Sequence, residues 1–247
     1  MSPQPTGSGR EDTLVVEFLG PAGVGKTTLA DTVGERLAET GLACYCPTAR
    51  IHRLGRPRRV LTKAALVTAG LRRAPVGTLS DLAHVLGIPQ QSRRDRVRVA
   101  FNWLYVRGLA SRRRTGVTLL DQGVLQALWS IGYRAVEGWD ALDGLALPTE
   151  CLPDLVVVVR ADPDTLRERL QSRDGDADET RMEAALAAIE RALAGVDAVE
   201  AVARDCERTL GRPAVVTVDN TPPGPPSAVV DRLVVEIRER ARVPSRD

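Results

Sequence analysis

One eight-residue stretch limits what this chain can fold into more than any other feature of it. Residues 20–27 read GPAGVGKT and match the pattern G-x-x-x-x-G-K-[ST] at every specified position. An apolar run at 14–19 precedes the stretch, and helical spacing of apolar residues follows over 26–40. One of only two lysines in the chain stands where the pattern requires it, so an accidental match has odds of roughly one in a thousand. The stretch therefore predicts a phosphate-binding loop between a strand and a helix.

The loop motif assigns a role to each of its residue types. The glycines let successive backbone N–H groups point inward at a phosphate, and the start of the following helix adds a partial positive charge. Lys26 would reach the β- and γ-phosphates of a nucleoside triphosphate, and the Thr27 hydroxyl would bind Mg²⁺. We therefore expect ATP and Mg²⁺ as cofactors, held by Gly20, Ala22, Gly23, Val24, Gly25, Lys26, Thr27 and Thr28.

Strand-like and helix-like segments alternate along the chain. Apolar and β-branched runs predict five strands, at residues 14–19, 42–46, 117–120, 155–159 and 213–218. Helical spacing predicts helices over 26–40, 59–71, 80–86, 92–113, 122–131, 162–172, 180–211 and 227–240. Glycine disfavours the interior of a helix, so a break is expected at Gly195. The alternation favours an α/β fold of three layers, α/β/α, with a five-stranded parallel sheet and a basic helical insertion.

The small net charge of +2 hides a strong segregation of charge along the sequence. Residues 50–114 hold fifteen arginines and one lysine against two acidic residues, a net of +14. The rest of the chain then holds 18 basic and 30 acidic residues, a net of −12. Arginine abundance can follow from genomic base composition, so its placement is the informative part. The segment is expected to face an anionic partner.

Composition excludes several classes of protein. The longest purely aliphatic runs are five residues at 155–159 and six, rich in alanine, at 184–189, whereas a membrane span needs about 20. The first residues lack the charged and apolar pattern of a secretion signal, and the four cysteines have no metal-binding spacing. We expect a cytoplasmic protein with no transmembrane segment, reduced thiols and one domain over 13–241. Disordered tails are expected at 1–12 and 242–247.

The sequence resembles thymidylate kinase and the related P-loop nucleoside and nucleotide kinases. The resemblance lies in VVEFLGPAGVGKTTLA at residues 15–30, TLLDQG at 118–123 and PDLVVVV at 153–159, continuing through 161–170 to Arg173. It implies a P-loop NTPase fold, with Asp121 as the acidic residue at the end of a strand. It also implies a lid region over 162–182, with Arg169 and Arg173 as the arginines that clamp the transferring phosphoryl group.

The sequence departs from these kinases where they bind the phosphate acceptor. Residues 46–50 read CPTAR instead of the Glu-Pro-Gly-Gly motif of thymidylate kinases, and Gln122 replaces the arginine that follows their aspartate. Deoxynucleoside kinases carry a carboxylate base near the second strand, but no acidic residue occurs between Glu39 and Asp81. The resemblance therefore leaves the acceptor open between a nucleotide and a nucleoside.

Other proteins with a phosphate loop fit the sequence less well. The chain lacks the Asn/Thr-Lys-x-Asp motif that reads guanine in GTPases, because its second lysine, Lys63, is followed by two alanines. The Leu-Ser-Gly-Gly signature of ABC proteins is absent, and Gln122 stands where AAA motors carry a second acidic residue. The favoured function is ATP- and Mg²⁺-dependent phosphoryl transfer to a small anionic acceptor.

Several candidate residues have more than one interpretation. Asp121 could hold the Mg²⁺ shell or take a proton from the acceptor, and it could also cap a helix beginning near Gln122. Arg169 and Arg173 share a helix face, as a phosphoryl clamp requires, although exposed arginines paired with neighbouring carboxylates would look the same. Asp162 fits a helix cap better than a catalytic acid.

The basic segment at 48–116 occupies the place where the kinases insert their acceptor-binding region. On the helix over 92–113, Val97, Phe101, Leu104 and Gly108 form one face that could pack on the core. A second face would direct Arg94, Arg98 and Tyr105 at the anionic acceptor. The alternative is a regulatory P-loop ATPase whose basic segment binds nucleic acid or a protein partner. An anionic membrane surface and a homodimer are also left open.

Overall fold

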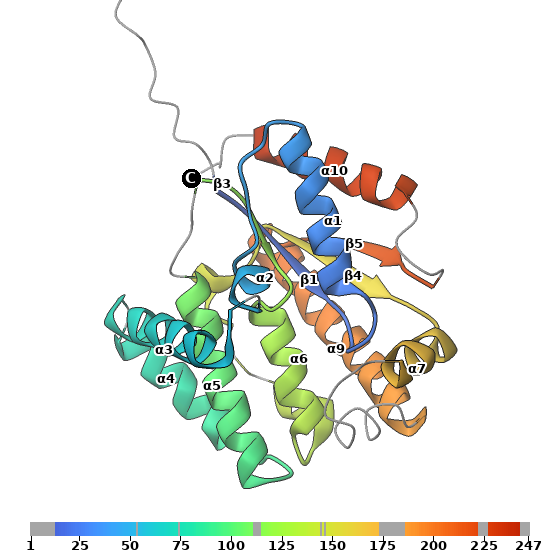
Figure 1. The fold of residues 1–247 in the computed structure, drawn as a ribbon. Helices are drawn as coiled ribbons and strands as arrows, with labels where there is room; N and C mark the ends of the chain where they lie inside the picture. The colour runs from blue at the N-terminus through green and yellow to red at the C-terminus, as the bar shows by residue number, and fades with distance from the viewer. Residues whose placement is uncertain are drawn as a thin grey trace, which may run out of the picture.

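The structure is a computed structural model that describes residues 13–52, 54–73, 75–110, 115–143, 145, 147–172, 186–221 and 227–242. Five parallel strands form one sheet in the order β2-β3-β1-β4-β5 (Figure 1). The strands are β1 (Thr13–Leu19), β2 (Cys44–Tyr45), β3 (Gly116–Leu120), β4 (Leu155–Arg160) and β5 (Ala214–Asp219). The five predicted strands are all present, and β2 is the shortest because only two of its residues pair with β3.

Helices connect the strands. Figure 1 shows α1 and α10 over one face of the sheet, with α6 and α9 over the other face and α3 to α5 beside them. The α-helices are α1 (Lys26–Glu39), α2 (Pro47–His52), α3 (Arg56–Arg73), α4 (Pro75–Gly87), α5 (Arg93–Ala110), α6 (Val124–Arg134), α7 (Pro163–Gln171), α9 (Leu186–Leu210) and α10 (Ser227–Arg242). Two short 3₁₀ helices are η1 (Gly138–Leu142) and η2 (Thr149–Cys151).

The two faces of the sheet have separate apolar cores. Side chains of neighbouring strand residues point to opposite faces, so Val156 and Val158 pack on the α6 and α9 side. Val157 and Val159 pack on the α1 and α10 side. The arrangement confirms the three-layer α/β/α fold with a five-stranded parallel sheet. None of the helices in the described ranges is both long enough and apolar enough to cross a membrane.

The basic segment is helical, as predicted, but α5 turns a different face to the core. Val97 is 70% exposed and Phe101 is 43% exposed, whereas Val99, Trp103 and Val106 are buried. The predicted packing face was therefore wrong at Val97 and Phe101, whereas Gly108 of the same face is buried against Leu66 of α3. Because α5 contacts α3, α4 and α6, its buried surface spans more of the helix than the single stripe expected from three-and-four spacing.

The helix α9 has no break at Gly195, so the interruption expected there was also wrong. Gly195 is buried inside the helix, and a Cβ atom at this position would overlap the ring of Trp139 in η1. The cost of glycine in a helix is about 1 kcal/mol relative to alanine. Packing against the indole ring outweighs this local preference, because it needs the space that only glycine leaves.

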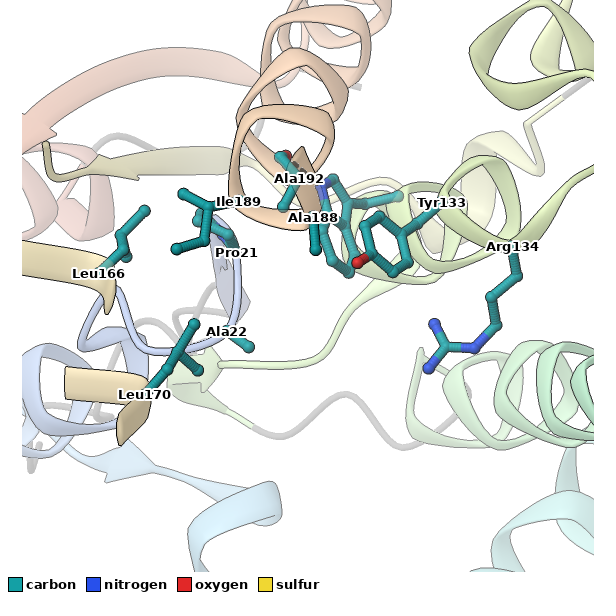
Figure 2. A pocket seen from close by; sticks show the side chains of 10 residues that line it. Pro21, Ala22, Tyr133, Arg134, Leu166, Leu170, Ala188, Ile189 and Ala192 are labelled. Atoms are coloured by element: carbon teal, nitrogen blue, oxygen red, sulfur yellow. Dashed lines mark hydrogen bonds between the residues drawn. The ribbon is translucent and has the colours of Figure 1, made fainter. Parts of the chain in front are cut away.

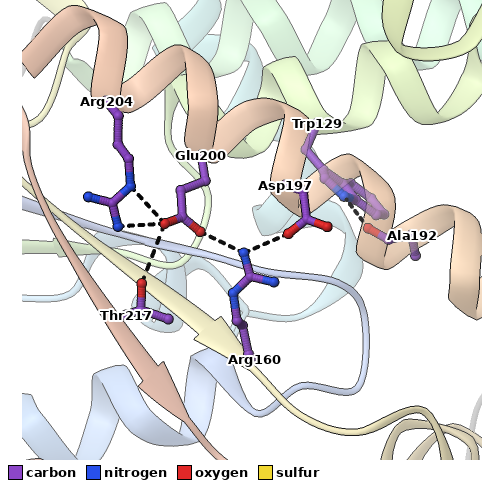
Figure 3. A network of polar contacts seen from close by, with 7 residues as sticks. All are labelled: Trp129, Arg160, Ala192, Asp197, Glu200, Arg204 and Thr217. Carbon is purple, nitrogen blue, oxygen red and sulfur yellow. Dashed lines mark hydrogen bonds and ion pairs between the residues drawn. The ribbon is translucent and has the colours of Figure 1, made fainter.

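A polar network fastens α9 to the carboxyl end of the sheet (Figure 3). The Arg160 guanidinium, at the end of β4, donates to Asp197 at 2.7 Å and to Glu200 at 2.6 Å. Glu200 also accepts from Arg204 at 2.6 Å, one turn further along α9. Trp129 of α6 donates its indole N–H to the Ala192 carbonyl of α9 at 3.0 Å. These contacts hold α6 and α9 in place beside the strand ends, where the candidate site lies.

Candidate active site

The phosphate loop follows β1, the central strand of the sheet, as the motif predicted. Gly25 has φ +92°, a left-handed conformation that suits glycine, and α1 begins at the next residue. The Lys26 ammonium donates to the backbone carbonyls of Gly20 at 2.7 Å and Pro21 at 2.8 Å. These bonds hold the lysine across the loop, where it can bind the phosphates that the loop backbone would surround.

Asp121 lies beside the phosphate loop, directly after β3. Its Oδ2 accepts a hydrogen bond of 3.0 Å from the Thr27 hydroxyl. Its Oδ1 is buried and has no hydrogen-bond partner among the described residues, which is costly unless a ligand supplies one. Mg²⁺ prefers oxygen ligands and takes one or two protein side chains together with substrate phosphates. The Thr27 hydroxyl and the Asp121 carboxylate therefore fit Mg²⁺.

The alternative role of Asp121, as a helix cap, is wrong. The helix α6 begins at Val124 rather than near Gln122, and its N-cap residue is Gly123, with no side-chain cap bond. The start of α6 instead meets Glu17 of β1, whose carboxylate accepts from the Gln126 N–H at 2.7 Å. Gln126 in turn accepts from the Gly20 N–H at 3.2 Å. Glu17 thus links the central strand, the start of α6 and the phosphate loop.

Sequence reasoning missed Glu17, although a carboxylate inside an otherwise apolar strand was a visible signal. Glu17 is fully buried, and burial raises its pKa to about 7 against the lowering effect of the backbone N–H groups at the start of α6. A Cβ atom on Gly123 would overlap the carboxylate, so that glycine leaves room for Glu17. The raised pKa makes the stability of the fold depend on pH.

Stability is expected to fall as pH rises from about 4.5 to about 7. In that range the folded state keeps a proton on Glu17 that the unfolded chain has lost, so rising pH favours unfolding. The shift corresponds to about 3 kcal/mol. Denaturant unfolding of the wild type and of Glu17→Gln at several pH values measures it. The difference in unfolding free energy between the two proteins should change across this range, and a constant difference would contradict the raised pKa.

The far side of the loop is held by two residues from other elements. Asn220, just after β5, donates its side-chain N–H to the Val24 carbonyl at 2.8 Å. Arg169 of α7 donates to the Asn220 carbonyl at 2.9 Å and to the Val24 carbonyl at 3.4 Å. A Cβ atom on Gly25 would lie 2.5 Å from the Asn220 amide nitrogen, so Gly25 also makes room for this contact.

These contacts place the predicted lid residues only in part. Arg169 lies against the phosphate loop, and its guanidinium donates to the Val24 and Asn220 carbonyls. Its role as a phosphoryl clamp stays a prediction. Arg173 and residues 174–182 of the predicted lid lie outside the described residues. Asp162 caps α7 by accepting from the Thr165 N–H at 2.8 Å, which confirms the cap interpretation. Asn220 was predicted only as part of a loop, and its anchoring role had no signal in the sequence.

A group of side chains from the basic segment and β2 lies near Asp121. We call Tyr45, Arg59, Lys63 and Tyr105 the Lys63 cluster. The Lys63 ammonium of α3 lies 4.9 Å from the ring centroid of Tyr105 on α5. Burial chiefly raises the pKa of the Tyr105 hydroxyl, and Asp121 and Tyr45 raise it further. The cluster therefore adjoins the aspartate that contacts the phosphate loop.

Lys63 is a site residue that sequence reasoning did not identify. Burial lowers the pKa of its ammonium, Arg59 lowers it further, and Asp121 acts in the opposite direction. The opposing effect of Asp121 means that the two charges are close enough to interact. The rarity of lysine was the available signal. The chain holds 32 arginines and two lysines, and the other lysine is Lys26.

The three predicted acceptor-binding residues of α5 do not lie together. Tyr105 is buried near Asp121, in the Lys63 cluster. Arg94 is exposed in the first turn of α5, about 16 Å along the helix axis from Tyr105 at 1.5 Å per residue. Arg98 is partly buried one turn further on, about 10 Å from Tyr105 by the same measure. Tyr105 interacts with the strand-end aspartate, and acceptor binding by Arg94 and Arg98 stays a prediction.

An apolar cavity opens beside the phosphate loop, between α6, α7 and α9 (Figure 2). It encloses about 430 Å³ of empty space, part of it open to solvent, with Pro21 and Ala22 of the loop in its wall. Trp129 and Tyr133 of α6 line it as a stacked pair, with ring centroids 4.9 Å apart. Leu166 of α7 lines the opposite side. The cavity can take up an apolar part of a ligand that also reaches the phosphate loop.

Comparison with known proteins shows similarity in fold. No protein-family model matches the sequence, and no curated protein matches it significantly. The structure of deoxyadenosine kinase from M. mycoides with bound dCTP is similar, with a TM-score of 0.50 and 10% identity over 92% of this chain and 100% of that chain. The same enzyme with bound dATP has a TM-score of 0.48 and 10% identity, over 91% of this chain and 99% of that chain.

The strand order, the phosphate loop after the central strand and the aspartate after the neighbouring strand define a P-loop fold. The similarity to deoxyadenosine kinase makes this the fold of the P-loop nucleoside kinases. The fold that the sequence resemblance implied is thereby confirmed. The similarity at 10% identity concerns the fold alone.

Proposed function

We propose that this protein transfers the γ-phosphoryl group of ATP, with Mg²⁺, to a small anionic acceptor, a nucleotide or a nucleoside. The observation that carries the proposal is the hydrogen bond between Thr27 and Asp121, next to a cluster with a second cation at Lys63. This hydrogen bond places the pair that fits Mg²⁺, Thr27 and Asp121, beside the phosphate loop. The positively charged Lys63 cluster lies on the acceptor side. A phosphoryl transfer site needs each of these parts.

Each residue at the site would have its own role in phosphoryl transfer. Backbone N–H groups of the loop bind the phosphates, and Lys26 balances the charge that develops on the β- and γ-phosphoryl oxygens. Thr27 and Asp121 hold Mg²⁺, which when bound neutralises charge on the phosphates. Arg169 keeps the loop in shape through the Val24 and Asn220 carbonyls. We propose that the acceptor approaches from the side of the Lys63 cluster.

An acceptor screen tests the proposal. The purified protein is incubated with ATP, Mg²⁺ and a panel of nucleosides, nucleotides and sugar phosphates, and the products are identified by mass spectrometry. We expect ADP and one phosphorylated acceptor in equal amounts. A reaction without Mg²⁺ and one without an acceptor are the controls.

The same assay separates the kinase from the regulatory ATPase. A regulatory ATPase would release ADP and free phosphate, and added DNA or RNA would change its rate. Its nucleic-acid affinity would fall steeply with salt, because many arginines would each contact a phosphate. This outcome, with no phosphorylated acceptor, would overturn the proposed function.

A further inference from the structure

Both lysines of the chain lie at the candidate site. Lys26 is in the phosphate loop, and Lys63 is partly buried above the ring of Tyr105. Each of the other 32 cationic side chains that carry a full charge at neutral pH is an arginine. A lysine ammonium is a compact charge with three donors, which can bind one phosphate oxygen in a narrow space where a planar guanidinium would not fit. We therefore expect Lys63 to have a role at the site.

The hydroxyl group of Tyr105 gives an independent sign of a missing partner. Tyr105 is 1% exposed, and its hydroxyl group has no hydrogen-bond partner in the described part of the chain. A buried hydroxyl without a partner is uncommon in folded proteins. The hydroxyl is near Asp121 and Tyr45, since both raise its pKa after burial, the main cause. A ligand oxygen placed beside Lys63 would accept a hydrogen bond from it.

The two carboxylates of the basic segment already form ion pairs with arginines. Asp81 of α4 pairs with the buried Arg107 guanidinium, which also donates to Glu150 at 2.9 Å. Asp95 of α5 lies 3.2 Å from the Arg134 guanidinium. Among the described residues of the segment, these two are the only acids. Asp121 accepts from Thr27 and suits the metal, so the described residues of the basic segment leave no further carboxylate as a general base.

The need for a base distinguishes two kinds of acceptor. A hydroxyl acceptor must lose a proton as it attacks phosphorus, and a positioned base normally takes that proton. A phosphate monoester has a second pKa of about 6, so its oxygen is already ionised at neutral pH. Lys63 and Arg59 bring two positive charges to the site against the single negative charge of Asp121. The net positive charge favours an anionic acceptor over a neutral one.

We propose that the acceptor is a phosphate monoester, such as a nucleoside monophosphate, and that the Lys63 ammonium and the Tyr105 hydroxyl bind its phosphate. An oxygen of the acceptor phosphate forms a new bond to the γ-phosphorus of ATP. The bond from that phosphorus to the β,γ-bridging oxygen breaks, and its electron pair leaves with ADP. The product is a phosphoanhydride, and no proton has to be removed. The inference rests on the proposed function and names its class of substrate.

Charge removal at Lys63 tests the inference. Lys63→Gln keeps most of the side-chain length and removes the cation, and Tyr105→Phe removes only the hydroxyl. The monophosphate KM should rise at least tenfold in Lys63→Gln and severalfold in Tyr105→Phe, with the ATP KM within twofold of wild type. Arg72→Gln, an exposed arginine on the same helix, is the matched control and should leave both KM values unchanged.

A binding measurement without ATP separates the two proposals. Isothermal titration with AMP, CMP, GMP and dTMP, and with the four nucleosides, should show a monophosphate bound by the wild type and at least tenfold more weakly by Lys63→Gln. A wild-type protein that phosphorylates nucleosides but no monophosphate would overturn this inference and keep the kinase. Monophosphate kinetics unchanged by Lys63→Gln would overturn it too. The absence of any phosphorylated product would overturn the proposed function itself.

Discussion

Replacing Lys26 by alanine is expected to lower kcat by about a thousandfold without unfolding the protein. In the proposed function, the Lys26 ammonium is the cation that acts on the transferring phosphoryl group, and its bonds to the Gly20 and Pro21 carbonyls hold it across the loop. Loss of one positioned donor to transition-state charge costs roughly 10²- to 10³-fold, and a full charge lies at the upper end. The measurement is the rate of acceptor phosphorylation at saturating ATP and acceptor.

The fold of the Lys26→Ala variant should survive. The hydrogen bonds from Lys26 to the Gly20 and Pro21 carbonyls stay within the loop, and the loop keeps its anchors from Asn220 and Gln126 on either side. Circular dichroism and thermal unfolding provide the control for folding. A folded variant with wild-type turnover would remove Lys26 from the mechanism and leave the loop as a binding element alone.

Asp121→Asn is expected to have the second largest effect, a fall of about a hundredfold in kcat/KM together with a higher Mg²⁺ requirement. Asparagine can still accept from Thr27, but it replaces a charged metal ligand by a neutral one. Because Asp121 does not cap α6, its replacement should change the stability of the fold little. Turnover measured across a Mg²⁺ titration tests the expected shift.

A second strand-end aspartate supplies the contrast for that experiment. Asp162 follows β4 by two residues and caps α7 through the Thr165 N–H. Asp162→Ala should lower the thermal unfolding midpoint and leave the Mg²⁺ requirement unchanged. If Asp121→Asn lost stability but kept its metal titration, Asp121 would be a structural residue, and the metal-binding pair would have to be sought elsewhere.

Residues close together in the sequence produced the accurate predictions. The phosphate loop needs only eight consecutive residues between a strand and a helix, and those residues specify the backbone path locally. The five strands are short apolar runs bounded by glycine, proline or charged residues, so their period is visible without partners. Their order in the sheet, with β1 between β3 and β4, was not predicted and comes from the structure.

Local patterns misled where one helix touches several neighbours. Three-and-four spacing selected Val97 and Phe101 as the packing face of α5, but α5 lies among three other helices and buries Val99 and Trp103 instead. Glycine preference predicted a break at Gly195, but the Trp139 ring occupies the space that a side chain would fill. Such spaces depend on which elements meet, and the sequence of a single helix does not contain that information.

The sequence by itself determined the phosphate loop, the order of strands and helices, and the presence of a basic segment between β2 and β3. The tertiary structure alone decided which residues share the site. It brings Lys63 and Tyr105, 42 positions apart, to the aspartate at position 121, and it places Glu17 under the start of α6 and Asn220 against Val24. The physical reason is that a phosphate loop is a local backbone conformation, whereas an acceptor site is a set of contacts between elements. Charge and periodicity showed that such contacts would exist, and only the packing of the helices on the sheet selected the residues that make them.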